Sequence, residues 1–216
     1  MRNPVEHLVA NILYTESKGP MCVNKEYLLS EIIDRIATCT RCGLCEHRTR
    51  TVPGEGNLNA RIFFVGEAPG REEDLSGRPF VGAAGTLFTE ILKSVKIDRK
   101  DVYIGNIIKC RPPDNRTPTM AEMDACAPFL LAQLQVVQPK LIVTLGASSL
   151  SYFLPEREIK ITEMRGKRLQ WEGGITIFPM FHPSYLLRNA SKAPGSPKAL
   201  TWDDIREVRR IYDQPE

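Results

Sequence analysis

The sequence is short of histidine and of long hydrophobic runs. Only three of its 216 residues are histidine, so we do not expect a hydrolytic metal site built from several histidines. No apolar run approaches the roughly 20 residues of a membrane-spanning helix, and the first 15 residues lack the small-residue cleavage site of a signal peptide. We therefore expect a cytoplasmic protein with no membrane partner, whose cysteines are metal ligands or core residues rather than disulfides.

Several common active-site motifs are also missing. GEAPG (66–70) lacks the spacing of a dinucleotide fingerprint, and the chain has no glycine-lysine-serine/threonine phosphate loop. LGASSLS (145–151) is not a nucleophile elbow, because no glycine follows the serine at the required offset.

Acidic residues are absent between Glu172 and Asp203, although the whole chain has a formal net charge of only +3. Arg188, Lys192 and Lys198 lie in that interval. A cationic strip of this kind suits a phosphate backbone, and a solvated loop that happens to lack acids fits the composition about as well.

Short apolar runs that lead into Gly, Asn or His predict buried parallel strands. These runs are RIFFVGE (61–67), VYIGNII (102–108), KLIVTLG (140–146) and ITIFPMFH (175–182). Helical patterns alternate with them over residues 83–95, 119–137, 147–153 and 200–212. We therefore predict one α/β domain with a parallel sheet covered by helices, whose binding crevice lies beyond the carboxyl ends of the strands.

Two short amphipathic helices are predicted before the first strand, over residues 1–15 and 25–37. Asn24 is available as the N-cap of the second helix, which carries Leu29, Ile32 and Ile36 on one face.

Three motifs together resemble the family 4, iron–sulfur uracil-DNA glycosylases. GEAPGREED (66–74), which runs into GRPFVGAAG (77–85), resembles the first motif and uracil pocket of that family. NIIKCRPP (106–113) resembles its next pocket strand, and FHPSYLLRN (181–189) its second catalytic motif. The resemblance covers residues 39 to about 212 and implies a three-layer fold with a four-stranded parallel sheet flanked by helices. It divides the chain into a glycosylase domain, residues 37–216, and a helical extension, residues 1–36.

The resemblance implies a DNA repair enzyme that flips uracil out of DNA and hydrolyses its N-glycosidic bond, leaving an abasic site. The expected partner is uracil-containing DNA in the nucleoid of a prokaryotic cytoplasm, and we expect a monomer. A module that binds or traps uracil-DNA without turnover is the alternative; however, the stretch CRPPDNRTPTMAE (110–122) is short and has no histidine that could trap the sugar. An electron-transfer protein is a third possibility, which the glycosylase motifs argue against.

Cysteines gather in CTRCGLC (39–45). By resemblance, Cys39, Cys42, Cys110 and Cys126 are the ligands of a [4Fe–4S] cluster with a structural role. Cys45 is surplus, because position 49 is Thr and a bacterial ferredoxin motif is therefore incomplete. Spacing alone also allows a four-cysteine zinc site, and the resemblance favours iron–sulfur.

The resemblance also assigns the uracil pocket. Phe80 stacks on the flipped base, Asn106 bonds O4 and N3–H of uracil, and His182 donates a hydrogen bond to O2 as the base departs. In isolation, Asn106 would be interpreted as a turn cap at a strand end. The alternatives for Phe80 and His182 are a loop residue anchored in the core and a structural histidine.

The first motif supplies further pocket residues. Gly66 and Ala68 line the base, and Ala68 stands where the best-known glycosylase branch has an Asp that orients the water. Glu67 is a possible substitute for that Asp. Gly70 replaces the bulky Tyr with which that branch excludes thymine, and Glu73 is the candidate for this exclusion here.

DNA contacts are expected beyond His182. Leu186 is the predicted wedge that fills the space left by the flipped base, with Leu187 as the runner-up. Arg188, Lys192 and Lys198 are the predicted phosphate contacts.

Overall fold

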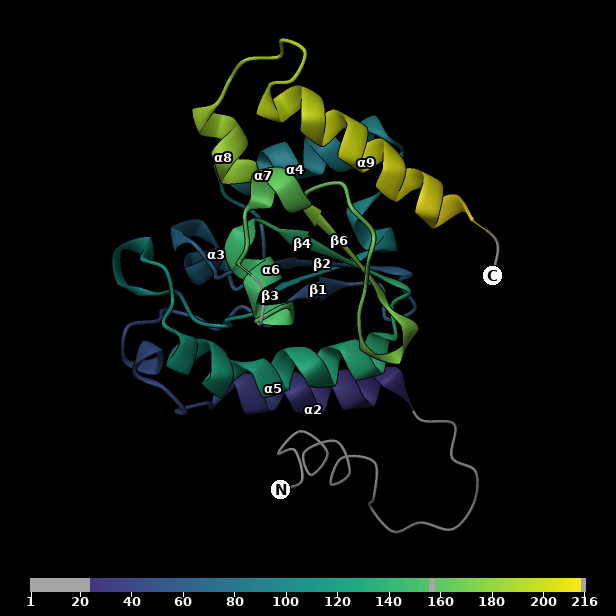
Figure 1. Cartoon of the computed structure of the whole chain (residues 1–216). Helices are drawn as coiled ribbons and strands as arrows, with labels where there is room; N and C mark the ends of the chain where they lie inside the picture. Colours follow the sequence, from purple (N-terminus) through teal and green to yellow (C-terminus); the bar gives the residue numbers. More distant parts are fainter. Residues whose placement is uncertain (1–23, 156–157, 215–216) are drawn as a thin grey trace.

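The computed structural model describes residues 24–155 and 158–214, which form an α/β fold with three layers (Figure 1). The helix predicted over residues 1–15 lies outside the described residues. Six strands form one sheet in the order β1-β3-β2-β4-β6-β5. The four central strands are parallel: β3 (Tyr103–Asn106), β2 (Ile62–Gly66), β4 (Leu141–Leu145) and β6 (Thr176–Met180).

The prediction of a four-stranded, purely parallel sheet is right for this centre and wrong for the edges. β1 (Glu55–Gly56) pairs antiparallel with β3, and β5 (Leu169–Gln170) pairs antiparallel with β6. Each edge strand has two residues, which is too short to give a hydrophobic pattern in the sequence.

Helices cover both faces of the sheet. The α-helices are α2 (Lys25–Ala37), α3 (Arg71–Ser76), α4 (Ala83–Ser94), α5 (Met120–Val137), α6 (Ala147–Phe153), α7 (Ile161–Met164), α8 (Pro183–Arg188) and α9 (Pro197–Asp213). The 3₁₀ turns are η1 (Gly43–Glu46), η2 (Arg99–Asp101), η3 (Pro113–Asn115) and η4 (Glu172–Gly174). The four helices predicted between and after the strands are confirmed, and α9 begins three residues earlier than predicted because Ser196 caps it.

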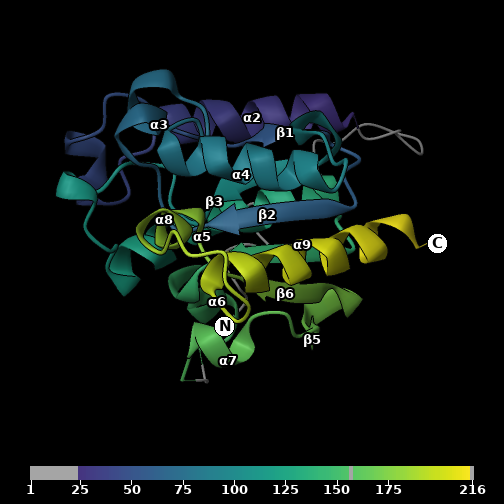
Figure 2. The same cartoon turned by 90° about the horizontal axis from the view of Figure 1, so that it is seen from above.

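Alternate side chains of each central strand pack into separate cores. Phe63 and Ile142 pack with helices α2, α5 and α6, whereas Phe64, Val143 and Phe178 pack with α4 and α9. In Figure 1, α2 and α5 lie side by side below the sheet, and Figure 2 looks down on α4 and α9 over its other face. Burial on both faces explains why the strands read as continuous apolar runs.

Helix α2 begins at the predicted cap. The Asn24 side chain accepts a hydrogen bond from the backbone N–H of Tyr27 at 3.1 Å. Leu28, Ile32 and Ile36 are buried against the same core as α5, although the division at residue 36, which stays a prediction, assigns α2 to the extension.

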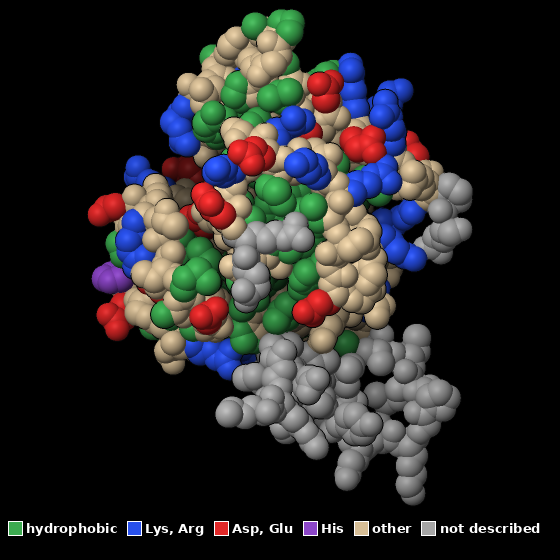
Figure 3. All heavy atoms as spheres, in the orientation of Figure 1, with side chains coloured by type: hydrophobic (Ala, Val, Ile, Leu, Met, Phe, Trp, Pro, Cys, Tyr) green, Lys and Arg blue, Asp and Glu red, His purple; other side chains and the backbone are tan. Residues whose placement is uncertain are grey.

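Basic and acidic side chains alternate over α7 and α9 in the space-filling view (Figure 3). Arg165 pairs with Asp204, and Arg168 pairs with Glu207. These ion pairs join α9 to the segment around α7. None of the helices in the described ranges has the length and hydropathy that crossing a membrane requires.

Candidate active site

A cavity of about 520 Å³ opens at the carboxyl ends of the four central strands. It lies where parallel α/β sheets bind their ligands. The predicted site residues that line it are Glu67, Ala68, Gly70, Glu73, Phe80, Asn106, His182 and Arg188. The structure therefore brings together side chains that are more than one hundred residues apart in the chain.

Gly66 lets Asn106 and Phe80 approach the end of strand β2. It is paired with Asn106 across β2 and β3. A Cβ atom at Gly66 would collide with Oδ1 of Asn106 and lie 2.7 Å from Cζ of Phe80. Asn106 is only 2% exposed, so its amide is a buried donor and acceptor at the cavity wall. Any side chain at position 66 would push these two groups apart.

Phe80 has a left-handed backbone, with φ at +51°. Its ring is buried, 5.3 Å from the ring of Phe88 and 5.9 Å from that of His182 between centroids. A Cβ at Gly85, in the first turn of α4, would collide with the carbonyl group of Phe80. Glycine at position 85 therefore lets the helix approach this strained residue.

The Glu73 carboxylate ties the first motif to the Phe80 loop. It accepts hydrogen bonds from the backbone N–H groups of Gly70 (3.1 Å), Val81 (2.8 Å) and Gly82 (2.8 Å). A Cβ at Gly70 would lie 2.8 Å from a carboxylate oxygen of Glu73. Glu73 thus occupies space beside position 70 that a larger residue there would need.

His182 is the N-cap of α8, and its ring is held by the first turn of that helix. Nδ1 accepts from the backbone N–H of Ser184 at 3.1 Å and lies 2.8 Å from Oγ of Ser184. Burial lowers the pKa of His182 to about 4. The positive charge of Arg188 also lowers this pKa, whereas the negative charge of Glu73 raises it. The imidazole is therefore neutral at pH 7, with its proton on Nε2.

Gly146, the residue after strand β4, lies close to His182. Gly146 has φ at +95°, and a Cβ there would lie 3.2 Å from Cβ of His182. Glu67, which follows β2, is half-buried at the cavity wall, and its backbone carbonyl accepts from the N–H of Ile108 at 3.1 Å.

A second, small cavity is lined by five cysteines: Cys39, Cys42, Cys45, Cys110 and Cys126. Nη1 of Arg48 donates to Sγ of Cys110, and the backbone N–H of Lys109 donates to Sγ of Cys126, both at 3.3 Å. Burial raises the pKa of Cys126 to about 12, so a bound metal centre would have to displace its proton.

The chain matches a known enzyme family over most of its length. A model of the Uracil DNA glycosylase superfamily matches residues 53–206. The type-4 uracil-DNA glycosylase of Thermotoga maritima is 54% identical over 185 residues, which cover 86% of this chain and 95% of that protein. The chain belongs to the type-4 uracil-DNA glycosylases. The resemblance that its motifs indicate is thereby confirmed.

Two further relatives allow the type-4 and type-5 enzymes to be compared. The type-4 enzyme of Sulfurisphaera tokodaii is 43% identical over 87% of this chain and 86% of that protein. A type-5 uracil-DNA glycosylase of Pyrobaculum aerophilum is 28% identical over 83% of this chain and 90% of that protein. The chain is therefore more similar to these two type-4 enzymes than to this type-5 enzyme.

The predicted wedge, Leu186, and its runner-up, Leu187, differ in exposure. Leu186 is 1% exposed, whereas Leu187 is 45% exposed. A side chain that fills a gap in DNA must project from the protein surface, so this exposure favours Leu187, and the wedge stays a prediction. The six-residue helix α8 is too short for its sequence to show which leucine faces inward.

The three predicted phosphate contacts do not lie together. Arg188 is exposed at the cavity beyond the strand ends. Lys192 and Lys198 instead line a separate hollow of about 480 Å³ among α4, α8 and α9, beside Leu186 and Trp202. Their contact with DNA stays a prediction.

Several residues that line the cavity were not predicted from the sequence. Ser148 follows strand β4, Asn115 ends the η3 turn, and Arg116 is the residue after it. The position of Ser148 after a strand end was an available signal. The η3 residues follow no strand directly, so nothing in their pattern indicates the cavity.

Proposed function

We propose that this chain flips uracil from DNA into the cavity at the strand ends and hydrolyses its N-glycosidic bond, leaving an abasic site. One observation carries the proposal. His182 lies at the wall of the cavity that Asn106 and Phe80 also line, and because its Nδ1 accepts from Ser184, the neutral ring keeps its N–H on the other nitrogen. Removing a base from the stack costs a few kcal/mol, about as much as such a pocket can return.

Asn106 and Phe80 recognise the base in this proposal. The Asn106 amide donates to O4 of uracil and accepts from N3–H, while cytosine presents the reverse pattern. Buried groups that cytosine leaves unpaired give strong discrimination, because each loses its bonds with water. The Phe80 ring stacks on the base, which is worth about 1–3 kcal/mol.

His182 stabilises the leaving group. Breaking the bond leaves positive charge on the sugar and negative charge on O2 of uracil. A neutral Nε2–H donor fixed at O2 strengthens its hydrogen bond as that charge grows, so it favours the transition state over the substrate. Glu67 is the residue proposed to position the water, because Ala68 has no polar side chain.

Glu73 is proposed to exclude thymine indirectly. Its three backbone hydrogen bonds fix the loops on either side of the base, and its carboxylate fills the space beside Gly70. We expect a wall fixed in this way to resist the shift that the methyl group of thymine would require.

DNA contacts complete the proposed complex. Leu187 fills the space that the flipped base leaves, and Arg188 binds a phosphate beside the cavity. Lys192 and Lys198, which line the separate hollow beside Trp202, are proposed to bind other phosphates of the DNA.

Cys39, Cys42, Cys110 and Cys126, which line the second cavity, are proposed to hold a [4Fe–4S] cluster. Four cysteines could also hold zinc, and the resemblance to the iron–sulfur glycosylases favours the cluster. Arg48 and the Lys109 N–H supply donors to the sulfurs. When bound, the cluster would tie the loop at residue 39 to helix α5.

One assay tests this function. The protein is incubated with oligonucleotides that contain uracil, cytosine or thymine at one position, and the strands are then treated with alkali. We expect strand breaks at uracil alone, with many turnovers and release of free uracil. A stable protein–DNA adduct would favour the trapping module, and an unchanged uracil strand would reject the proposal.

A further inference from the structure

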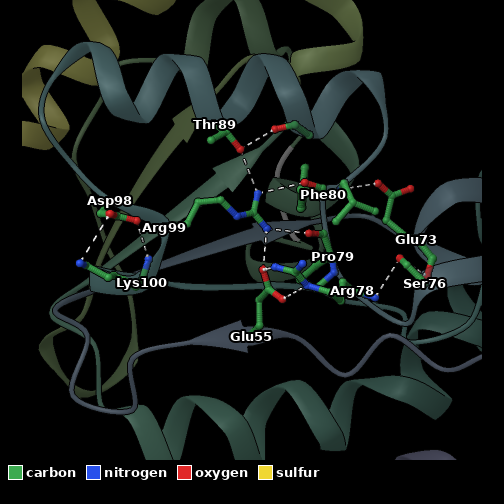
Figure 4. A network of polar contacts seen from close by, with 12 residues as sticks. Glu55, Glu73, Ser76, Arg78, Pro79, Phe80, Thr89, Asp98, Arg99 and Lys100 are labelled. Carbon is green, nitrogen blue, oxygen red and sulfur yellow. Dashed lines mark hydrogen bonds and ion pairs between the residues drawn. The ribbon is translucent and has the colours of Figure 1, made fainter.

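Arg99 lies outside the uracil-site cavity and holds the backbone of Phe80 (Figure 4). Its Nη1 donates to the carbonyl of Phe80 at 2.9 Å, and its Nη2 donates to the carbonyl of Pro79 at 2.8 Å. We propose that Arg99 is a positioning residue for uracil recognition, which fixes the Phe80 ring in the place where it stacks on the base. This inference rests on the proposed function.

Phe80 needs such a support because of its backbone. A left-handed conformation is unfavourable for a bulky residue and persists only where the surroundings enforce it. On one side, Val81 and Gly82 donate their N–H groups to Glu73. On the other side, the carbonyls of Pro79 and Phe80 accept from Arg99. The strained residue is therefore held from both sides.

Arg99 is itself held in place. Its Nη2 donates to Oε1 of Glu55 at 2.9 Å, and its Nη1 lies 3.3 Å from Oγ1 of Thr89. Glu55 also pairs with Arg78 at 2.8 Å, so one carboxylate at the edge strand β1 joins two residues that flank or grip the Phe80 loop. The Arg99 side chain is 18% exposed, and the geometry leaves it little freedom.

The planar guanidinium suits this task. Arginine presents several N–H groups in a fixed fork, and here they reach two carbonyls, a carboxylate and a hydroxyl. Lysine would keep the charge for Glu55 but could not reproduce the fork. Arg99→Lys therefore separates the ion pair from the grip on the loop.

The first experiment compares binding of wild type, Arg99→Lys and Arg99→Met to two DNAs. One carries an uncleavable uracil nucleotide, and the other an abasic-site analogue with no base to stack on. We expect Arg99→Met to bind uracil-DNA roughly tenfold more weakly, close to the loss of a stacking contact, with abasic-DNA affinity unchanged. Arg99→Lys should show a smaller loss of the same kind. Lys100→Ala is the matched control, because Lys100 is in the same turn, is exposed and, among residues 24–155 and 158–214, forms an ion pair only with Asp98.

The second experiment is a double-mutant cycle. If Arg99 acts through Phe80, Arg99→Lys should have no further effect in a Phe80→Ala background. Equal losses on both DNAs, additive effects in the cycle or wild-type binding by both Arg99 variants would overturn the inference. Wild-type protein that does not excise uracil would instead reject the proposed function, so the two failures are distinguishable.

Discussion

The backbone N–H of Ser184 donates to Nδ1 of His182 at 3.1 Å. This one bond decides what the imidazole can do, because a neutral ring that accepts at Nδ1 carries its proton on Nε2. The first turn of α8 therefore prepares a hydrogen-bond donor without requiring a positive charge. Since burial disfavours the charged ring, the same fold that holds the donor keeps it neutral.

His182→Ala should slow the chemical step about 10²–10³-fold, a loss of about 3–4 kcal/mol of transition-state stabilisation. Binding should change far less, because O2 of uracil becomes strongly negative only as the bond breaks. Single-turnover excision and affinity for uncleavable uracil-DNA measure the two effects. His47→Ala is the control, since that ring is exposed. Equal small losses in rate and affinity would make His182 a structural residue.

The pH dependence should follow the lowered pKa of His182. Because that pKa is about 4, the ring stays neutral well below pH 6.5, and the single-turnover rate should show no inflection near that value. The unfolded chain has an ordinary histidine pKa of about 6.5 and therefore binds the proton first. The contribution of His182 to the free energy of unfolding is intact above that pH and is lost as the pH falls toward about 4. Excision rates and urea unfolding from pH 8 to 4.5 test both statements, and an inflection of the rate near 6.5 would contradict the first.

The strands were the most predictable part of this fold. The run RIFFVGE predicts 61–67 and the observed strand is Ile62–Gly66, because burial on both faces leaves a continuous apolar signal. The edge strand Glu55–Gly56 leaves no such signal. Its pairing depends on a partner almost fifty residues away, which no local pattern records.

Residues of the cavity were predictable where they end or follow strands, as Asn106 and His182 do. The topology alone brings the strand ends to one cavity. Arg99 could not be found in this way, because its role depends on contacts with carbonyls of Pro79 and Phe80 about twenty residues earlier. The sequence also could not show which of the neighbours Leu186 and Leu187 is buried, because this depends on how α8 packs.

Leu187→Ala should lower excision from duplex DNA about tenfold, with less effect on single strands, because only a duplex leaves a gap beside the partner base. Its exposure means that the melting temperature should hardly change. Leu186→Ala is the matched variant and should instead lower the free energy of unfolding by about 2–5 kcal/mol, since it empties a buried site. The reverse result would restore Leu186 as the wedge.

Cys110→Ser should prevent the chain from holding the proposed iron–sulfur cluster. Wild-type protein purified without oxygen should be brown and contain about four iron atoms per chain, with matching sulfide. Cys45→Ser is the control, because Cys45 lines the same small cavity but is not a proposed ligand. We expect that variant to keep its iron and its colour. Zinc in place of iron, or equal loss in both variants, would contradict the assignment.

Asn106→Asp should weaken uracil excision by about 1–3 kcal/mol, or roughly 5- to 160-fold, because a carboxylate cannot donate to O4 of uracil. The same oxygen can accept from the amino group of cytosine, so cytosine excision should rise from its low wild-type level. Single-turnover excision rates on uracil-containing and cytosine-containing DNA give the ratio of uracil to cytosine excision. Asn115→Asp places the same charge at the wall of the same cavity and should leave that ratio unchanged. Wild-type uracil activity in Asn106→Asp would mean that Asn106 does not read the base, and an equal change of the ratio in Asn115→Asp would attribute it to charge alone.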